Sequence, residues 1–146
     1  MTTPDQAAIK SSLDNLITAF FRAVSFDVGA QPSYESIPAL FVERGLLIKN
    51  SGPVPEISSV AEFIEPRLEL VRSGALTCFL EAEISESTMM FGNVAHRFSV
   101  YTKSGTSGGV VFTARGMIST QFVCTPAGWK MSAMAWDDER PGLVIA

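Results

Sequence analysis

The sequence predicts an α+β fold in which N-terminal helices pack against a strongly curved antiparallel sheet. Three observations predict it. Apolar residues recur at helical spacing near the N-terminus, alternating segments follow residue 75, and short turns separate those segments. Because the helices come first and the strands last, the helices should cover one face of the sheet. We expect residues 1–146 to form one domain.

The first helix is predicted to begin at Thr3 and Pro4, since Thr3 and Gln6 form a capping-box pattern and proline suits the first helical position. Seven apolar residues then follow the helical period and form one broad face: Ile9, Leu13, Leu16, Ile17, Phe20, Phe21 and Val24. This face is wide enough to lie across a sheet.

The middle of the chain predicts short helical turns over 34–40, a strand over 41–49 and a second helix. Ser59 and Glu62 form a capping box that opens this helix, which should run from Val60 to about Arg72. Pro66 lies inside it and should kink or shorten it, because proline lacks the N–H that the preceding turn needs.

Three long strands follow and are expected to form an antiparallel meander with one buried face. We assign its apolar rows to that face: Cys78, Leu80, Ala82 and Ile84; Val94, His96, Phe98 and Val100; Val110, Phe112, Ala114, Ile118 and Phe122. A Gly/Ser-rich loop should span 104–109, and the last strand runs from Trp129 to about Trp136. Gly116, in mid-strand, is expected to let the sheet bend.

Composition narrows the functional classes. The chain is 47% hydrophobic and 18% charged, which suggests an apolar cavity or a face covered by a partner. The net charge is −4 and Lys and Arg form no cluster, so nucleic acid is not an expected partner. No membrane-spanning stretch or secretory signal is visible, and we expect a cytoplasmic protein with Cys78 and Cys124 as buried free thiols.

The order of elements resembles the nuclear transport factor 2-like superfamily, in its SnoaL-like branch. The residues that carry the resemblance are 20–24 (FFRAV), 39–41 (ALF), 92–101 (GNVAHRFSVY) and 128–131 (GWKM), which runs into Trp136. The resemblance implies a cone-shaped, cystatin-like sheet around a central cavity, and a homodimer formed through the outer sheet face. It also implies functional breadth, because isomerases, cyclases, dehydratases and non-enzymatic binding modules share this shape.

His96 and Asp137 are the candidate catalytic residues. His96 is the only histidine, and a histidine can exchange a proton near neutral pH. Asp137 ends the last strand, where a carboxylate at the rim of an apolar pocket would gain proton affinity. The alternatives are a structural core histidine and a solvated strand end.

A ligand would contact the apolar lining and one phenol, and the candidate ligand-binding residues are Tyr34, Phe20, Phe98, Phe112, Ile118, Met131 and Trp136. Tyr101 shares strand parity with Arg97 and should face water or a partner. A polar face of Arg97, Arg115, Ser99, Ser119 and Gln121 suits either a wet dimer interface or plain solvent exposure, and Glu81 and Glu83 could pair with its arginines.

These patterns predict a protein that binds a hydrophobic ring-bearing or acyl metabolite. It would act by acid–base chemistry as an isomerase, cyclase or dehydratase, without a metal or cofactor, because no zinc spacing, phosphate loop or nucleophile elbow is present. The alternative is a non-catalytic module that dimerises and fills its interior with its own side chains.

Overall fold

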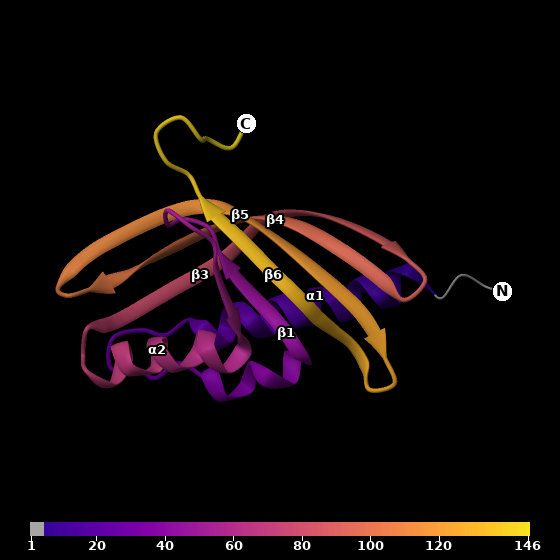
Figure 1. The fold of residues 1–146 in the computed structure, drawn as a ribbon, viewed down its shortest axis with the longest axis horizontal. Helices are drawn as coiled ribbons and strands as arrows, with labels where there is room; N and C mark the ends of the chain where they lie inside the picture. The colour runs from indigo at the N-terminus through magenta and orange to yellow at the C-terminus, as the bar shows by residue number, and fades with distance from the viewer. Residues whose placement is uncertain (1–4) are drawn as a thin grey trace.

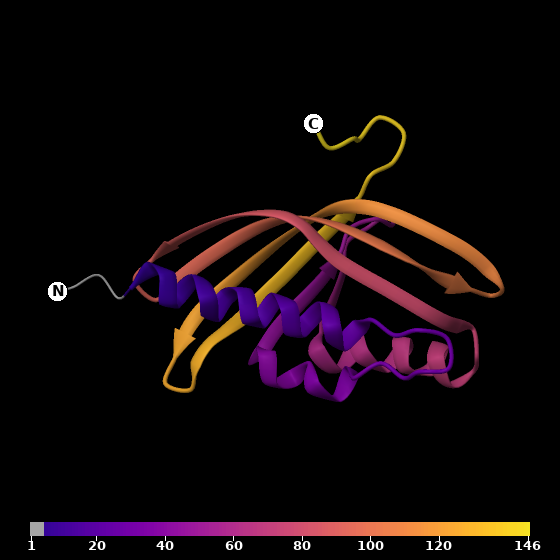
Figure 2. The same ribbon diagram turned by 180° about the vertical axis from the view of Figure 1, so that it is seen from behind.

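The computed structural model describes residues 5–146, which form one six-stranded sheet with helices on its concave side (Figure 1). In chain order the elements are α1 (Gln6–Val24), the 3₁₀ turns η1 (Tyr34–Ser36) and η2 (Pro38–Leu40), β1 (Phe41–Lys49), β2 (Glu56–Ser59), α2 (Val60–Arg72), β3 (Leu76–Phe91), β4 (Val94–Ser107), β5 (Val110–Thr125) and β6 (Gly128–Asp138). Seen from behind, α1 and α2 lie along the same concave side of the arch (Figure 2).

The α+β fold with N-terminal helices on the concave face is confirmed. The strand order is β2-β1-β6-β5-β4-β3, and the sheet is open at both edges. It is mixed and not purely antiparallel, because β1 runs parallel to β6. The short edge strand β2 was missed, since its four residues pair with β1 without showing an alternating apolar pattern of their own.

The first helix packs its apolar face onto the sheet as predicted. Leu13, Ile17, Phe20 and Val24 are buried against the inner face. The helix begins at Gln6, and its N-cap is Asp5, whose carboxylate accepts a hydrogen bond from the Ala7 amide at 3.1 Å. The predicted cap residues Thr3 and Pro4 lie outside the described residues.

The second helix has the predicted bounds and capping box. The Ser59 hydroxyl accepts from the Glu62 amide at 3.1 Å, and the Glu62 carboxylate accepts from the Ser59 amide at 2.9 Å. Pro66 does not shorten this helix, which continues to Arg72. Its ring lines a cavity beneath the sheet instead.

The predicted inward and outward faces are correct for β5 and wrong for β3 and β4. Residues directly opposite one another on paired strands share a face. Ile118 of β5 is buried and lies opposite Ser99, while Gly116 lies opposite Tyr101. Hence Ser99 and Tyr101 face inward with Arg97, and the apolar row of β4 faces outward. On β3, likewise, Glu81 and Glu83 face inward while Leu80, Ala82 and Ile84 face outward.

A buried ion-pair network explains how charged residues occupy the inner face. Arg97 is only 3% exposed, and its Nη1 lies 2.5 Å from Asp14 of α1. Its Nη2 and Nε donate to the two carboxylate oxygens of Glu83 at 2.6 and 3.0 Å, and Ser99 also donates to Glu83. The expected pairing of Glu83 with an arginine is confirmed. These charged groups can be buried because they satisfy one another. The rule that apolar residues mark the inner face of a strand therefore failed for β3 and β4.

The rest of the predicted polar face is split between the two sides of the sheet. Arg115, Ser119 and Gln121 are exposed on the outer side, opposite in direction to Arg97.

The predicted loop over 104–109 is mostly strand, and only Gly108 and Gly109 form the turn, both with positive φ. Both cysteines are free, but Cys124 is exposed and Cys78 only half-buried, so the expectation that both are buried was wrong. Across residues 5–146, no helix combines the length and the apolarity that crossing a membrane requires.

Candidate functional site

A cavity of about 390 Å³ lies between α2, η1 and the concave face of the sheet. Most of its wall is apolar: Phe20, Val24, Phe63, Pro66, Leu70, Leu76, Phe79, Phe112, Ile118, Met134 and Trp136. The Phe63 ring stands edge-on to Trp136 at 6.0 Å between centroids and also contacts Phe20 at 6.1 Å. Volume and lining are those of a site for a small organic molecule.

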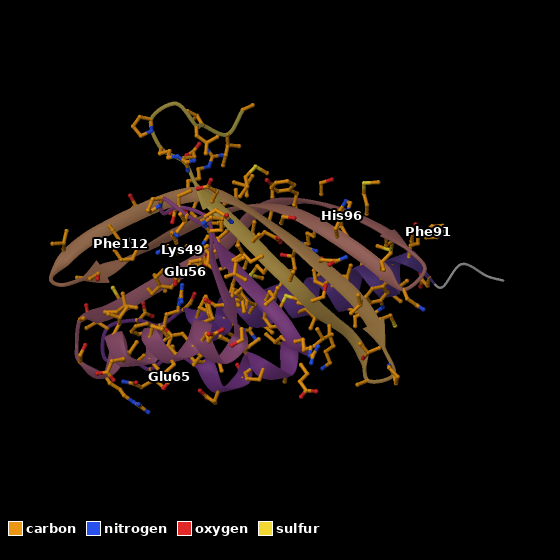
Figure 3. All side chains as sticks on the ribbon, viewed as in Figure 1. Lys49, Glu56, Glu65, Phe91, His96 and Phe112 are labelled. Atoms are coloured by element: carbon orange, nitrogen blue, oxygen red, sulfur yellow. The ribbon has the colours of Figure 1, made fainter. Side chains whose placement is uncertain are left out.

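Charged and phenolic groups also line this cavity. They are Tyr34, Lys49, Glu56, Arg67, Glu81 and Lys103. Figure 3 shows that Lys49 and Glu56, neighbours across the β1–β2 pair, lie between the sheet and α2. No group of three or more His, Cys, Asp or Glu side chains in the described part of the chain is arranged to hold a metal ion.

Glu81 and Lys103 face each other across β3 and β4. The Lys103 ammonium nevertheless pairs with Asp138 at the end of β6, with 3.0 Å between Nζ and Oδ1. Within residues 5–146 the Glu81 carboxyl group has no ion pair and no hydrogen bond. It therefore lies in an apolar wall with its polar atoms free for a ligand.

The surroundings of Glu81 favour its protonated form. Burial raises the pKa of the Glu81 carboxyl to about 7, and the negative charge of Asp138 adds to the effect, whereas Lys103 opposes it. A carboxyl group with a pKa near neutrality exists in both protonation states at physiological pH. It can accept a proton in one state and donate one in the other.

Tyr101 positions Asp138, the residue that pairs with Lys103. Its side chain is completely buried, and its hydroxyl donates to the Asp138 carboxylate and approaches the Asp137 carbonyl oxygen at 3.0 Å. Burial first, and then Asp138, raise the pKa of the phenol, so it keeps its proton. The expectation that Tyr101 faces water or a partner was wrong. Tyr101 fixes Asp138, which in turn holds Lys103.

Gly116 makes room for this phenol. A Cβ atom at Gly116 would collide with the Tyr101 ring and hydroxyl and with the Asp137 carbonyl oxygen. Gly116 therefore permits the close approach of a neighbouring side chain, while the pairing of β5 with β4 and β6 continues through it.

The helical wall contributes Arg67 and Tyr34. The Arg67 guanidinium carbon lies 3.7 Å from the centroid of the Phe63 ring, and its Nη1 donates to the Phe63 carbonyl oxygen at 2.9 Å. Tyr34 is buried, and burial raises the pKa of its phenol. Both side chains are therefore hydrogen-bond donors at neutral pH.

Five of the seven predicted ligand-binding residues line the cavity: Phe20, Tyr34, Phe112, Ile118 and Trp136. The other two do not. Phe98 is 51% exposed on the convex face, because its strand has the opposite orientation to the one predicted. Met131 is fully buried in the core, where a bulge at Ser132 separates it from the cavity-lining Met134.

The structure does not bring His96 and Asp137 together. His96 is exposed on the convex side of the sheet, as is Phe91 (Figure 3). It lies opposite Gln121 on β5, whereas Asp137 lies opposite Met117, well along the same strand. Asp137 pairs with Arg140 at 2.6 Å, also away from the cavity. The predicted inward orientation of His96 is therefore wrong.

Apart from Tyr34, sequence reasoning missed the polar residues of the cavity, although a signal was present for Glu81 and Lys103 of the sheet. Glu81 and Glu83 alternate with apolar residues in β3, and Arg97, Ser99, Tyr101 and Lys103 do so in β4. Aligning both strands with the correctly oriented β5 would have placed all six on the inner face. The register needed for that alignment is set by turn geometry and by the bulge between Glu83 and Ser85.

The chain has an open, arched sheet with helices and an apolar cavity on its concave side. This architecture places it in the class of cone-shaped α+β proteins. Comparison with solved structures assigns the fold more closely. A nuclear transport factor 2-like protein with a cystatin-like fold from Novosphingobium aromaticivorans superposes with a TM-score of 0.71 at 16% identity, over 97% of this chain and 92% of the other. The chain thus has the nuclear transport factor 2-like fold, as its sequence predicted.

Two further solved structures have the same fold. A protein from Novosphingobium aromaticivorans provisionally named an aromatic ring hydroxylase matches with a TM-score of 0.74 at 16% identity, over 92% of each chain. Another from the same organism, provisionally named a scytalone dehydratase, matches with a TM-score of 0.73 at 12% identity, over 96% of this chain and 89% of the other. At such identities the likeness concerns the fold. No protein-family model and no curated protein sequence matches the chain.

Proposed function

We propose that this protein binds a hydrophobic ring-bearing or acyl metabolite in its concave cavity and catalyses an acid–base isomerisation, cyclisation or dehydration. The observation that carries the proposal is Glu81, an uncommitted carboxyl group with a pKa near 7 in the wall of an apolar cavity. The fold it shares with a provisionally named dehydratase is in keeping with this chemistry.

In this mechanism the Glu81 carboxylate removes a proton from a carbon atom of the bound molecule. The resulting carboxylic acid returns the proton to a second carbon atom in an isomerisation, or to a departing hydroxyl group, which leaves as water, in a dehydration. Lys103, held by Asp138, lies next to Glu81 and stabilises negative charge that develops on the ligand. Phe63 and Trp136 exclude water from the reacting atoms.

Native mass spectrometry of the protein purified from its source cells tests the binding step, because it reports a co-purified metabolite directly. The metabolite is then incubated with the wild-type protein and with Glu81→Gln. We expect the variant to bind the metabolite and to lose turnover by at least a hundredfold. Undiminished turnover by Glu81→Gln would overturn the mechanism.

The convex face favours a second function, dimerisation. Six large apolar side chains are exposed on the outer side of β3 and β4 or at the turn between them: Leu80, Ile84, Met89, Phe91, Val94 and Phe98. No Asp, Glu, Lys or Arg of these strands shares that side over 84–100. Such an apolar, uncharged surface is suited to self-association. Two copies of the protein related by a two-fold axis would cover each other's surface. We include this homodimer in the proposal.

We place the protein in the cytoplasm as part of the same proposal. Its two cysteines are free thiols, which persist in a reducing compartment.

A further inference from the structure

Arg67 is the only arginine that lines the cavity, and most of its hydrogen-bonding capacity is unused. A guanidinium group has five N–H donors. Within the described chain, its one hydrogen bond runs from Nη1 to the Phe63 carbonyl oxygen. The Phe63 ring beneath the guanidinium fixes its plane, so Nε and Nη2 are held in place without a protein acceptor.

No carboxylate of residues 5–146 lies within 4 Å of Arg67. The contrast with Arg97 is clear, since that guanidinium binds both Asp14 and Glu83. Glu56 and Glu81 are near enough to affect the pKa of Arg67, which burial lowers, but neither pairs with it. A partly desolvated, unpaired guanidinium is unfavourable unless an anion binds to it.

Tyr34 adds a second donor on the same wall. It is 4% exposed, its hydroxyl makes no hydrogen bond to residues 5–146, and it lines the same cavity as Arg67. Arg67 and Tyr34 come from α2 and η1, whereas Glu81 comes from the sheet opposite. A ligand could therefore bind donors at one wall and meet the proton-transfer group at the other.

We propose that the ligand is a compact aromatic or alicyclic carboxylate whose carboxylate group is bound by Arg67 and Tyr34. The inference rests on the proposed function, because it specifies the molecule that the same cavity takes. The guanidinium fork matches a planar carboxylate in a bidentate manner. The aromatic wall of Phe63 and Trp136 accounts for the ring, and about 390 Å³ limits it to one or two rings.

Isothermal titration calorimetry with two probes of equal shape tests the inference. The probes are 2-naphthoate and its neutral analogue 2-naphthamide, each titrated into the full-length protein. We expect wild type to bind the carboxylate at least tenfold more tightly than the amide, since hydrogen bonds to charged groups are stronger than neutral ones. Arg67→Gln should remove this preference while still binding the amide, and Arg67→Lys should keep part of it.

Arg72→Gln is the matched control, because Arg72 is exposed in the last turn of the same helix. It should leave the preference unchanged. Equal binding of both probes by wild type, or a preference that persists in Arg67→Gln, overturns the carboxylate inference while leaving cavity binding intact. Failure of both probes to bind overturns the proposed binding function as well. Circular dichroism of each variant confirms that it is folded.

Discussion

Glu81 and Lys103 are opposite neighbours on β3 and β4, yet Lys103 forms its ion pair with Asp138 on β6. Glu81 is therefore a carboxyl group without a counter-ion in an apolar wall. Residues that stabilise a fold usually satisfy one another, as Arg97 and Glu83 do. A group left unsatisfied in a cavity is a mark of a functional site.

The stability of the protein should respond to pH through Glu81. The folded-state pKa of about 7 lies above the usual pKa of a glutamate side chain, 4.5, so folding favours the protonated form. This stabilisation is complete below about pH 4.5 and is lost as the pH rises through 7. We expect Glu81→Gln to raise the free energy of unfolding by about 3 kcal/mol at pH 8 and to change it little at pH 4. Urea unfolding at both pH values measures the difference.

Glu65→Gln provides the control for this experiment, because Glu65 lies on the side of α2 that faces away from the sheet (Figure 3). It should change stability equally at pH 4 and pH 8. If Glu81→Gln behaved in the same way, Glu81 would not be a carboxyl group of raised pKa.

The Arg97 network should contribute strongly to stability. Arg97→Met leaves Asp14 and Glu83 without their buried partner, and we expect a loss of about 3 kcal/mol in urea unfolding. Arg115→Met, at a position whose side chain is 48% exposed, should lose less than about 0.5 kcal/mol. Combining Arg97→Met with Glu83→Leu should lose less than the two single changes added together. Additive losses would contradict a direct interaction.

Gly116→Ala should destabilise the protein, because the new methyl group has no space beside Tyr101 and the Asp137 carbonyl. We expect a loss of about 2–3 kcal/mol in thermal or urea unfolding. Gly52→Ala is the matched control, since a Cβ atom there meets only a carbonyl oxygen at 3.8 Å. A tolerated Gly116→Ala would mean that Tyr101 does not pack over this glycine.

The proposed dimer should depend on Phe98. Sedimentation velocity at micromolar concentration should show a dimer for wild type and a monomer for Phe98→Lys, because a lysine would be desolvated at the centre of an apolar interface. Val28→Lys, at an exposed turn residue outside the convex face, should remain dimeric. A monomeric wild-type protein would contradict the dimer proposal.

The sequence predicted the helices, the long strands and the Ser59–Glu62 capping box, because their signals are local. It could not predict which side of β3 and β4 is inside. The alternating pattern of a strand shows that it has two faces but not which one is buried. The prediction assumed that the apolar face is the buried one. Here the outer face is apolar, and the inner face holds Glu81, which has no side-chain partner among residues 5–146, together with Arg97 and Tyr101, which bind Asp14 of α1 and Asp138 of β6. The sequence pattern of a single strand does not show ion pairs and hydrogen bonds to distant elements.

The central claim is that the concave cavity, and not the convex face around His96, binds small molecules. Nuclear magnetic resonance with 2-naphthamide tests it directly, because Trp136 lines the cavity and His96, the only histidine, lies on the opposite side of the sheet. We predict that the Trp136 indole N–H resonance moves on titration while the His96 ring resonances stay in place. Movement of the His96 signals with an unchanged Trp136 signal would contradict the claim.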